Sequence, residues 1–214
     1  MNRLLFACSF AFLTCIGSAA VVFNNGAPNL ASADEVGDII VAEDFSLSGG
    51  VTLTGFEFWS LEGAAQYHGN ITWFLYSDSS GPNAILAQGS ASTALQITRT
   101  ATSNNCCPNF DEFDNVVSFT DSLTSGSLVL GPGTYWLGLH NGDISNTAFD
   151  DFYWETTDNN ATTFGVFQDL PPGGGWTTTS QEHAFNISGE TPEPGTWAMI
   201  SVGLAFLAIR RRAR

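Results

Sequence analysis

Residues 70–77 read Asn-Ile-Thr-Trp-Phe-Leu-Tyr-Ser and carry the clearest strand pattern in the sequence. Side chains alternate along an extended chain, so one face presents Ile71, Trp73 and Leu75 and the other presents Thr72, Phe74 and Tyr76. The segment ends in residues 78–83, Asp-Ser-Ser-Gly-Pro-Asn, which are typical of a turn. Because aromatic rings occupy both faces, the pattern predicts a central strand that is covered on both sides.

Short runs of the same kind, separated by Gly, Asn, Asp and Pro, recur along the chain, and no segment between Val21 and Glu190 shows a sustained helical period. About ten short strands with frequent turn residues predict an all-β fold, a jelly-roll-like β-sandwich that forms one domain over residues 21–189. We expect residues 24–34 and 173–180, which are poor in apolar side chains, to form a leading segment and a loop. The other predicted strands are Asp38–Phe45, Val51–Ser60, Ala84–Gly89, Leu95–Ala101, Val116–Thr120, Leu128–Leu130, Thr134–His140, Phe152–Glu155, Thr163–Phe167 and Glu182–Ser188.

The C-terminus has three parts with distinct physical properties. Pro192 and Pro194 flank Glu193 and predict an extended, solvated segment. Residues 195–209 carry no charge and can enter hydrocarbon as a helix of about 22 Å, which is short of the roughly 30 Å core of a bilayer. The basic cluster that follows is expected to stay on the cytoplasmic side and consists of Arg210, Arg211, Arg212 and Arg214.

This order of parts resembles the PEP-CTERM sorting signal of Gram-negative, exopolysaccharide-producing bacteria. The resemblance implies transient insertion in the inner membrane, recognition by an exosortase that removes the tail, and delivery of the body to the cell surface or extracellular matrix. The alternative, a short core helix with a solvated basic tail, is disfavoured because no other segment is helical enough to pack against it. Thr191 stands where the family often has an apolar residue.

The body also resembles the domain common among secreted PEP-CTERM proteins, whose activity is unassigned. The segments that carry this resemblance are residues 44–47, residues 54–59 and the turn and strand at 131–137. They are structural in character, so the resemblance implies a fold and no reaction.

The N-terminus has the three regions of a secretory signal peptide. Arg3 supplies the positive charge, residues 4–16 are apolar, and residues 17–20 are small, as signal peptidase requires. We predict a signal peptide over residues 1–20, with cleavage after about Ala20. The apolar run is too short for a membrane anchor, and the residues before Cys15 do not form a lipobox.

The charge of the body excludes one class of partner. Five of the six basic residues and one of the 21 acidic residues lie in the two terminal segments, which leaves Arg99 against 20 acidic residues and a formal charge of −19. Nucleic acid is excluded, because binding phosphates requires a basic surface. The charge favours solubility in an extracellular matrix or the binding of divalent cations.

Candidate site residues are few. Cys106 and Cys107 lie in an exported chain and can form a vicinal disulfide, an intermolecular cross-link or free thiols, of which we favour the disulfide. Loop carboxylates can ligate calcium, although their spacing does not match an EF-hand and we predict no metal site and no cofactor. The weak calcium candidates are Asp111, Glu112, Asp114, Asp150 and Asp151.

No catalytic motif is present: the three histidines lie outside any HExxH pattern and no serine lies in a GxSxG elbow. Trp176, in a Gly-rich stretch, is the tryptophan we expect to be most exposed and a possible glycan contact. We therefore expect a secreted, non-enzymatic protein, structural or adhesive, of the surface or exopolysaccharide matrix. The alternatives are a carbohydrate- or calcium-binding module and, less favoured, a hydrolase that acts on polysaccharides.

Overall fold

The computed structural model describes residues 19–104, 107–123, 127–158, 163–170 and 174–191. The apolar helix and arginine cluster predicted at the C-terminus lie outside these residues, as does the signal peptide apart from Ala19 and Ala20. Within the described part of the chain, no helix has both the length and the hydropathy needed to span a bilayer.

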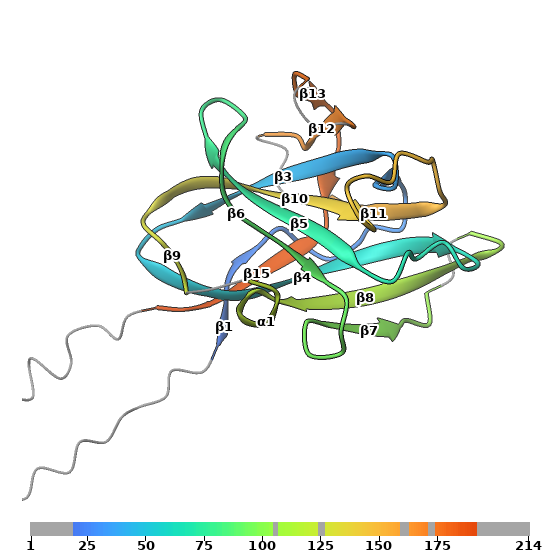
Figure 1. The fold of residues 1–214 in the computed structure, drawn as a ribbon, viewed down its shortest axis with the longest axis horizontal. Helices are drawn as coiled ribbons and strands as arrows, with labels where there is room; N and C mark the ends of the chain where they lie inside the picture. Colours follow the sequence, from blue (N-terminus) through green and yellow to red (C-terminus); the bar gives the residue numbers. More distant parts are fainter. Residues whose placement is uncertain (1–18, 105–106, 124–126, 159–162, 171–173, 192–214) are drawn as a thin grey trace, which may run out of the picture.

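The body consists of antiparallel strands and one short helix, α1 (Phe119–Ser122) (Figure 1). The strands are β1 (Ala20–Asn24), β2 (Ala33–Glu35), β3 (Ile39–Leu47), β4 (Val51–Gly63), β5 (Ile71–Asp78), β6 (Pro82–Ala91), β7 (Ile97–Ala101), β8 (Phe110–Ser118), β9 (Leu128–Leu130), β10 (Gly133–Asn141), β11 (Phe152–Thr157), β12 (Val166–Asp169), β13 (Thr177–Thr178), β14 (Glu182–His183) and β15 (Phe185–Glu190).

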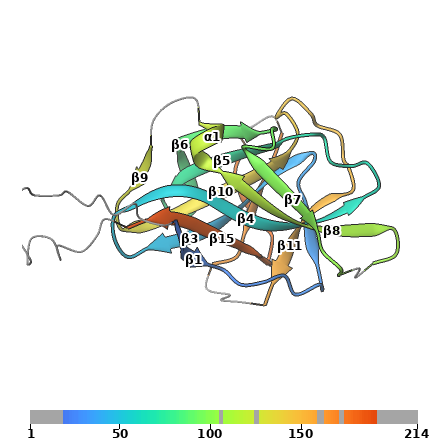
Figure 2. The ribbon, with the colours of Figure 1, turned by 90° about the horizontal axis from the view of Figure 1, so that it is seen from below.

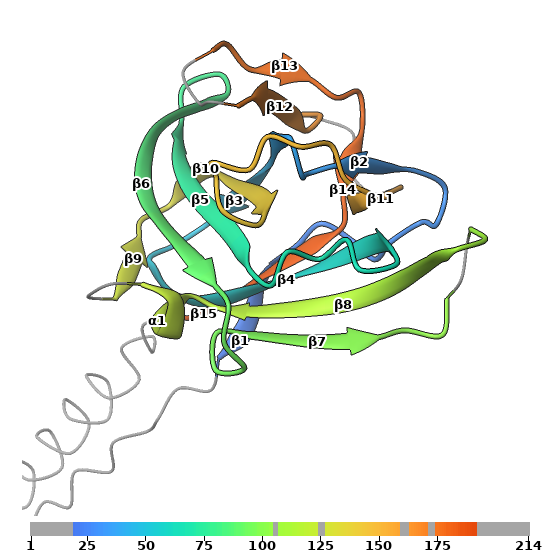
Figure 3. The ribbon, with the colours of Figure 1, turned by 45° about the vertical axis from the view of Figure 1, so that its right-hand side comes forward.

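The strands form two sheets that pack face to face as a sandwich (Figures 1 and 3). The long strand β4 is the axis of the nine-stranded sheet: β8 and β9 pair along one of its edges, and β15 and β11 pair along the other. The six-stranded sheet has the order β13-β12-β3-β10-β5-β6. This arrangement confirms the predicted all-β sandwich class.

Strand β5 confirms the alternation predicted from residues 70–77. Ile71, Trp73 and Leu75 are buried in the main core between the sheets, whereas Phe74 and Tyr76 are buried on the opposite face of the six-stranded sheet. β5 pairs with β10 on one side and β6 on the other, so it lies inside its sheet. The outer face holds a second apolar cluster of Ile40, Ala42, Phe74, Tyr76, Trp136 and Val166.

Several boundaries differ from the sequence predictions. The predicted strand Val116–Thr120 is the end of β8, which starts at Phe110, and the chain then turns into α1 because the Ser118 side chain accepts a hydrogen bond from the Asp121 amide at 3.2 Å. The predicted strand Glu182–Ser188 is divided at Ala184 into β14 and β15. The leading segment contributes β2 and the end of β1, and the expected loop at 173–180 contains β13.

The two ends of the body lie side by side. Ala20 of β1 pairs with Gly189 of β15, so β1 begins beside the point where β15 ends (Figure 2). Any segment attached before β1 and any segment attached after β15 therefore starts from one place on the body.

Candidate functional site

The acidic residues singled out from the sequence do not form one site. On β8, Glu112 is 1% exposed, whereas its neighbour Asp111 is exposed at the surface. Asp150 accepts a hydrogen bond from Asn141 Nδ2 at 3.0 Å and lies 3.2 Å from His68 Nε2, and Asp151 accepts one from the Tyr153 hydroxyl at 3.1 Å. Within the described ranges, no three carboxylate, imidazole or thiolate groups come together as metal ligands.

Asp150 instead belongs to a buried acidic pair with Glu35. The Glu35 carboxylate accepts hydrogen bonds from the amides of Gly37, Asp38 and Asp150. Burial, followed by the neighbouring Asp38, raises the pKa of Glu35 to about 9. Burial is also the main cause that raises the pKa of Asp150. Both carboxyls therefore bind a proton more tightly in the folded protein than they would in water.

A polar cavity of about 500 Å³ opens on the outer face of the six-stranded sheet. The strand register builds it: Trp136 of β10 lies opposite Asp44 of β3, and Thr134 lies opposite Ser46, so these side chains share one face. The turn after β5 closes one wall and the stretch before β12 closes another. The lining residues are Asp44, Ser46, Asp78, Ser80, Gly81, Thr134, Trp136, Thr163, Phe164, Val166 and Thr178.

Hydrogen bonds fix the wall of this cavity. Trp136 Nε1 donates to Asp78 Oδ1 at 2.9 Å, and the Gly81 amide donates to the same oxygen at 3.1 Å. The hydroxyl groups of Ser46 and Thr134 are 3.0 Å apart and bond to each other. Trp136 is almost fully buried beneath the cavity, whereas Phe164 at its rim is 41% exposed.

The two cavity carboxyls differ in acidity. Burial, together with the negative charges of Glu43 and Asp78, raises the pKa of Asp44 to about 6. The hydrogen bond from Trp136 lowers the pKa of Asp78, with help from the amides of Gly81 and Ser80. Near pH 6 the cavity therefore holds one carboxylate and one carboxyl that exchanges its proton.

Trp176 does not line this cavity. It is half-buried and packs on the apolar cluster of the same sheet face, with its ring in an edge-to-face contact with Tyr76 at a centroid distance of 5.4 Å. Most of its ring surface is thus occupied by protein. The predicted disulfide includes Cys106, which lies outside the described residues.

A buried histidine escaped the sequence analysis. His183 of β14 is fully buried, with Nδ1 2.8 Å from Glu43 Oε2 and Nε2 2.9 Å from Asp34 Oδ2. Burial lowers its pKa, but the hydrogen bonds and charges of the two carboxylates outweigh burial and raise the pKa to about 9. The partners are 140 and 149 residues away in sequence, so no local motif marks this triad.

The geometry defines a β-sandwich with a polar cavity on one face, in which the first strand begins beside the end of the last strand. Residues 190–212 match the family described as the PEP-CTERM protein-sorting motif. This motif implies export, a membrane-anchored sorting intermediate and processing by an exosortase on the way to the cell surface. No curated protein matches the sequence significantly.

Proposed function

We propose that the protein is a non-enzymatic, adhesive component of the cell surface or exopolysaccharide matrix, and that its body binds a neutral glycan in the polar cavity. The observation that carries the proposal is a cavity lined by hydroxyls and carboxyls on a chain with a surface-sorting signal. The N-terminal segment supplies export through signal peptidase. By binding polysaccharide, the body would act as an adhesive at the cell surface or in the matrix, to which the sorting signal directs it.

The chemistry of the lining favours an uncharged saccharide. Sugar hydroxyls donate to carboxylates and exchange hydrogen bonds with serine and threonine hydroxyls. Asp78 and Thr134 offer such groups, and the exposed ring of Phe164 offers an apolar surface for a sugar face. The formal charge of −19 on the body opposes an anionic polymer.

Calorimetric titration of the mature protein with neutral oligosaccharides from the host polysaccharide tests this proposal. Asp78→Asn and Phe164→Ala should each weaken binding about tenfold or more, since each removes a group that lines the cavity. Phe149→Ala is the matched control, because Phe149 is 66% exposed and lies outside the cavity. Equal binding by all three variants would reject the cavity as the glycan site.

A hydrolase that acts on polysaccharides is the second candidate, and the unequal pKa values of Asp44 and Asp78 favour it. Glycoside hydrolysis uses one protonated carboxyl as acid and one carboxylate as base or nucleophile. An enzyme would release reducing ends from the polysaccharide and lose this activity in Asp44→Asn. An adhesive module would bind without releasing them.

Calcium binding is tested in the same protein by thermal unfolding. A calcium module would melt at higher temperature with added Ca²⁺ and at lower temperature with EGTA. A glycan-binding body without a structural cation would respond to neither.

A further inference from the structure

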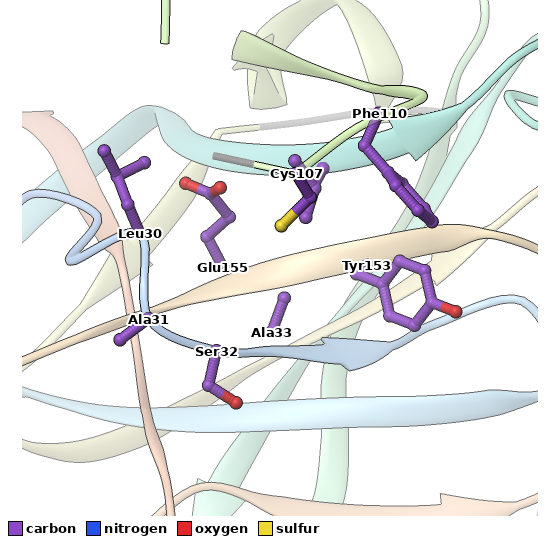
Figure 4. A pocket seen from close by; sticks show the side chains of 9 residues that line it. Leu30, Ala31, Ser32, Ala33, Cys107, Phe110, Tyr153 and Glu155 are labelled. Atoms are coloured by element: carbon purple, nitrogen blue, oxygen red, sulfur yellow. The ribbon is translucent and has the colours of Figure 1, made fainter. Parts of the chain in front are cut away.

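A second pocket, of about 240 Å³, lies on the outer face of the nine-stranded sheet (Figure 4). The register of β11 explains its composition, because Tyr153 lies opposite Leu61 of β4 and Glu155 lies opposite Ala33 of β2. Most of its lining is apolar. The lining residues are Leu30, Ala31, Ser32, Ala33, Leu61, Cys107, Phe110, Tyr153 and Glu155.

One charged side chain reaches into this apolar pocket. Glu155 is 1% exposed, and its carboxyl group points between Leu30 and Cys107 (Figure 4). Its Oε2 atom is buried and has no hydrogen-bond partner among the residues that the structure describes. A buried carboxylate without a partner is destabilising, because burial removes its hydrogen bonds to water and no protein group replaces them.

A second glutamate, Glu112, also has a buried carboxyl oxygen that lacks a hydrogen bond within the described residues. Glu112 of β8 is also 1% exposed, and its Oε2 atom is buried without a partner in the described part of the chain. The only hydrogen bond found for its other oxygen, within the described residues, is a long one of 3.5 Å from Asn104. Burial and the charge of Glu112 together raise the pKa of Glu155 to about 7, which places the two groups within electrostatic reach of each other.

The two cations of the described body, Arg99 and the protonated His183, are bound to other carboxylates, and His183 is paired with Asp34 and Glu43. Arg99, the single Lys or Arg residue of the body sequence, is bonded to Glu62 and to Asn115 Oδ1, the latter at 2.9 Å. The residues that it contacts are not among those that line the pocket. No Lys, Arg or His side chain of the described residues lines the pocket, so its cationic partner is sought in another molecule.

We propose that this pocket binds the side chain of a lysine from a partner protein, with the ammonium group at Glu155 and the methylene stem against Leu30 and Leu61. A lysine presents both an apolar stem and a cationic head, which matches an apolar wall that ends in a carboxylate. The Phe110 and Tyr153 rings, 5.9 Å apart between centroids, add aromatic surface beside it.

The lining argues against the two other simple ligands. Calcium requires six to eight oxygen ligands, whereas most of this lining is apolar and the described residues bring no three metal-ligating groups together. An uncharged apolar ligand would leave Glu155 without a partner. The pocket is also smaller than the roughly 300–1,000 Å³ of drug-sized sites, which fits a single side chain.

Titration of the mature protein with Nα-acetyl-lysine methylamide, followed by NMR, tests the proposal. The norleucine analogue is the matched probe, because it keeps an apolar stem and lacks the charge. We expect the lysine probe to bind at least about tenfold more tightly than the norleucine probe. Equal affinity for the two probes, or no binding of the lysine probe, would overturn the proposal.

Substitutions inside and outside the pocket test where the lysine probe binds. Glu155→Gln should weaken binding of the lysine probe about tenfold or more, while its folding is preserved or improved because the unpartnered charge is gone. Asp169→Asn, which changes an exposed carboxyl of β12 that lines neither cavity, should leave the affinity unchanged. Displacement of the lysine probe by Ca²⁺, or full binding by Glu155→Gln, would show that the pocket is not a lysine site.

Discussion

The guanidinium carbon of Arg99 lies 3.7 Å from the centroid of the Tyr67 ring. The same group lies 4.5 Å from the centroid of Phe113 and donates a hydrogen bond to Glu62, whose side chain is 5% exposed. Cation–π contacts and a hydrogen-bonded partner thus hold the only Lys or Arg side chain of the body sequence, on β7 of the nine-stranded sheet.

Arg99→Met should destabilise the protein strongly. Removing the guanidinium leaves the carboxylate of Glu62 buried and without its positive partner, and breaking a buried pair in this way costs about 3–5 kcal/mol. Urea unfolding of the variant measures the loss.

Glu62→Gln provides the rescue for Arg99→Met. In the double variant the uncompensated charge is absent, so its stability should exceed that of Arg99→Met alone. A double variant as unstable as Arg99→Met would show that packing against Tyr67 and Phe113 dominates, and not the ion pair.

A glycine beside the buried histidine provides the second prediction. A Cβ atom on Gly165 would lie 2.6 Å from the His183 ring and 2.7 Å from Glu43 Oε2. Gly165→Ala should therefore separate this pair and destabilise the fold by about 1–3 kcal/mol, as overpacking does. Thermal unfolding measures it.

Gly174→Ala is the control for that change, because a Cβ atom there meets nothing within 4 Å. It should leave the melting temperature nearly unchanged. If Gly165→Ala and Gly174→Ala melt at the same temperature, the His183 site accepts the added methyl group without loss of stability, and the prediction is contradicted.

Stability should fall as pH rises from about 5 to 9. The folded-state pKa of His183 is raised from 6.5 to about 9, that of Glu35 from 4.5 to about 9, and that of Glu182 from 4.5 to about 7. A group with a raised pKa binds protons more tightly when folded, so its contribution is complete below the unfolded pKa and is lost as pH rises through the folded pKa. Self-repulsion of the acidic body acts in the same direction.

Thermal unfolding between pH 5 and 9 checks this dependence, with about 2–4 °C of melting temperature expected for each kcal/mol lost. Glu35→Gln should flatten the slope, because it removes one of the titrating groups. The carboxyls with lowered pKa, Asp78 and Asp143, titrate below this window and do not oppose the trend. A stability that rises toward pH 9 would contradict the assignment.

The fold was predictable where its signal is local. The alternation along residues 70–77 determines both faces of β5, since each side chain follows directly from strand geometry. Helix α1 was missed because Phe119 follows Val117 at the two-residue spacing of a strand. Its packing against Trp73, at a centroid distance of 4.7 Å, shows that the chain has turned inward. Strands β2 and β13 have three and two residues, too few for any periodicity to register.

The candidate sites were less predictable, because they are made by contacts between distant segments. Glu112 was grouped with Asp111 as one loop cluster, yet a strand that begins at Phe110 sends the two side chains to opposite faces. Extending the predicted strand back from Val116 would have separated them. Nothing local indicates that Trp136 bonds to Asp78, 58 residues earlier, or that Glu155 lies near Glu112.

The last prediction concerns the mature chain. Since β1 starts at Ala20 and β15 ends at Glu190, cleavage after about Ala20 and near Pro192 would leave the sandwich essentially whole. Intact-mass spectrometry of protein from the surface of the host should find a species without the first ~20 residues and without residues 195–214. A mass that retains Arg210 to Arg214 would mean that the tail is a lasting anchor, and partners of the two cavities would then have to be sought at the envelope and not in the matrix.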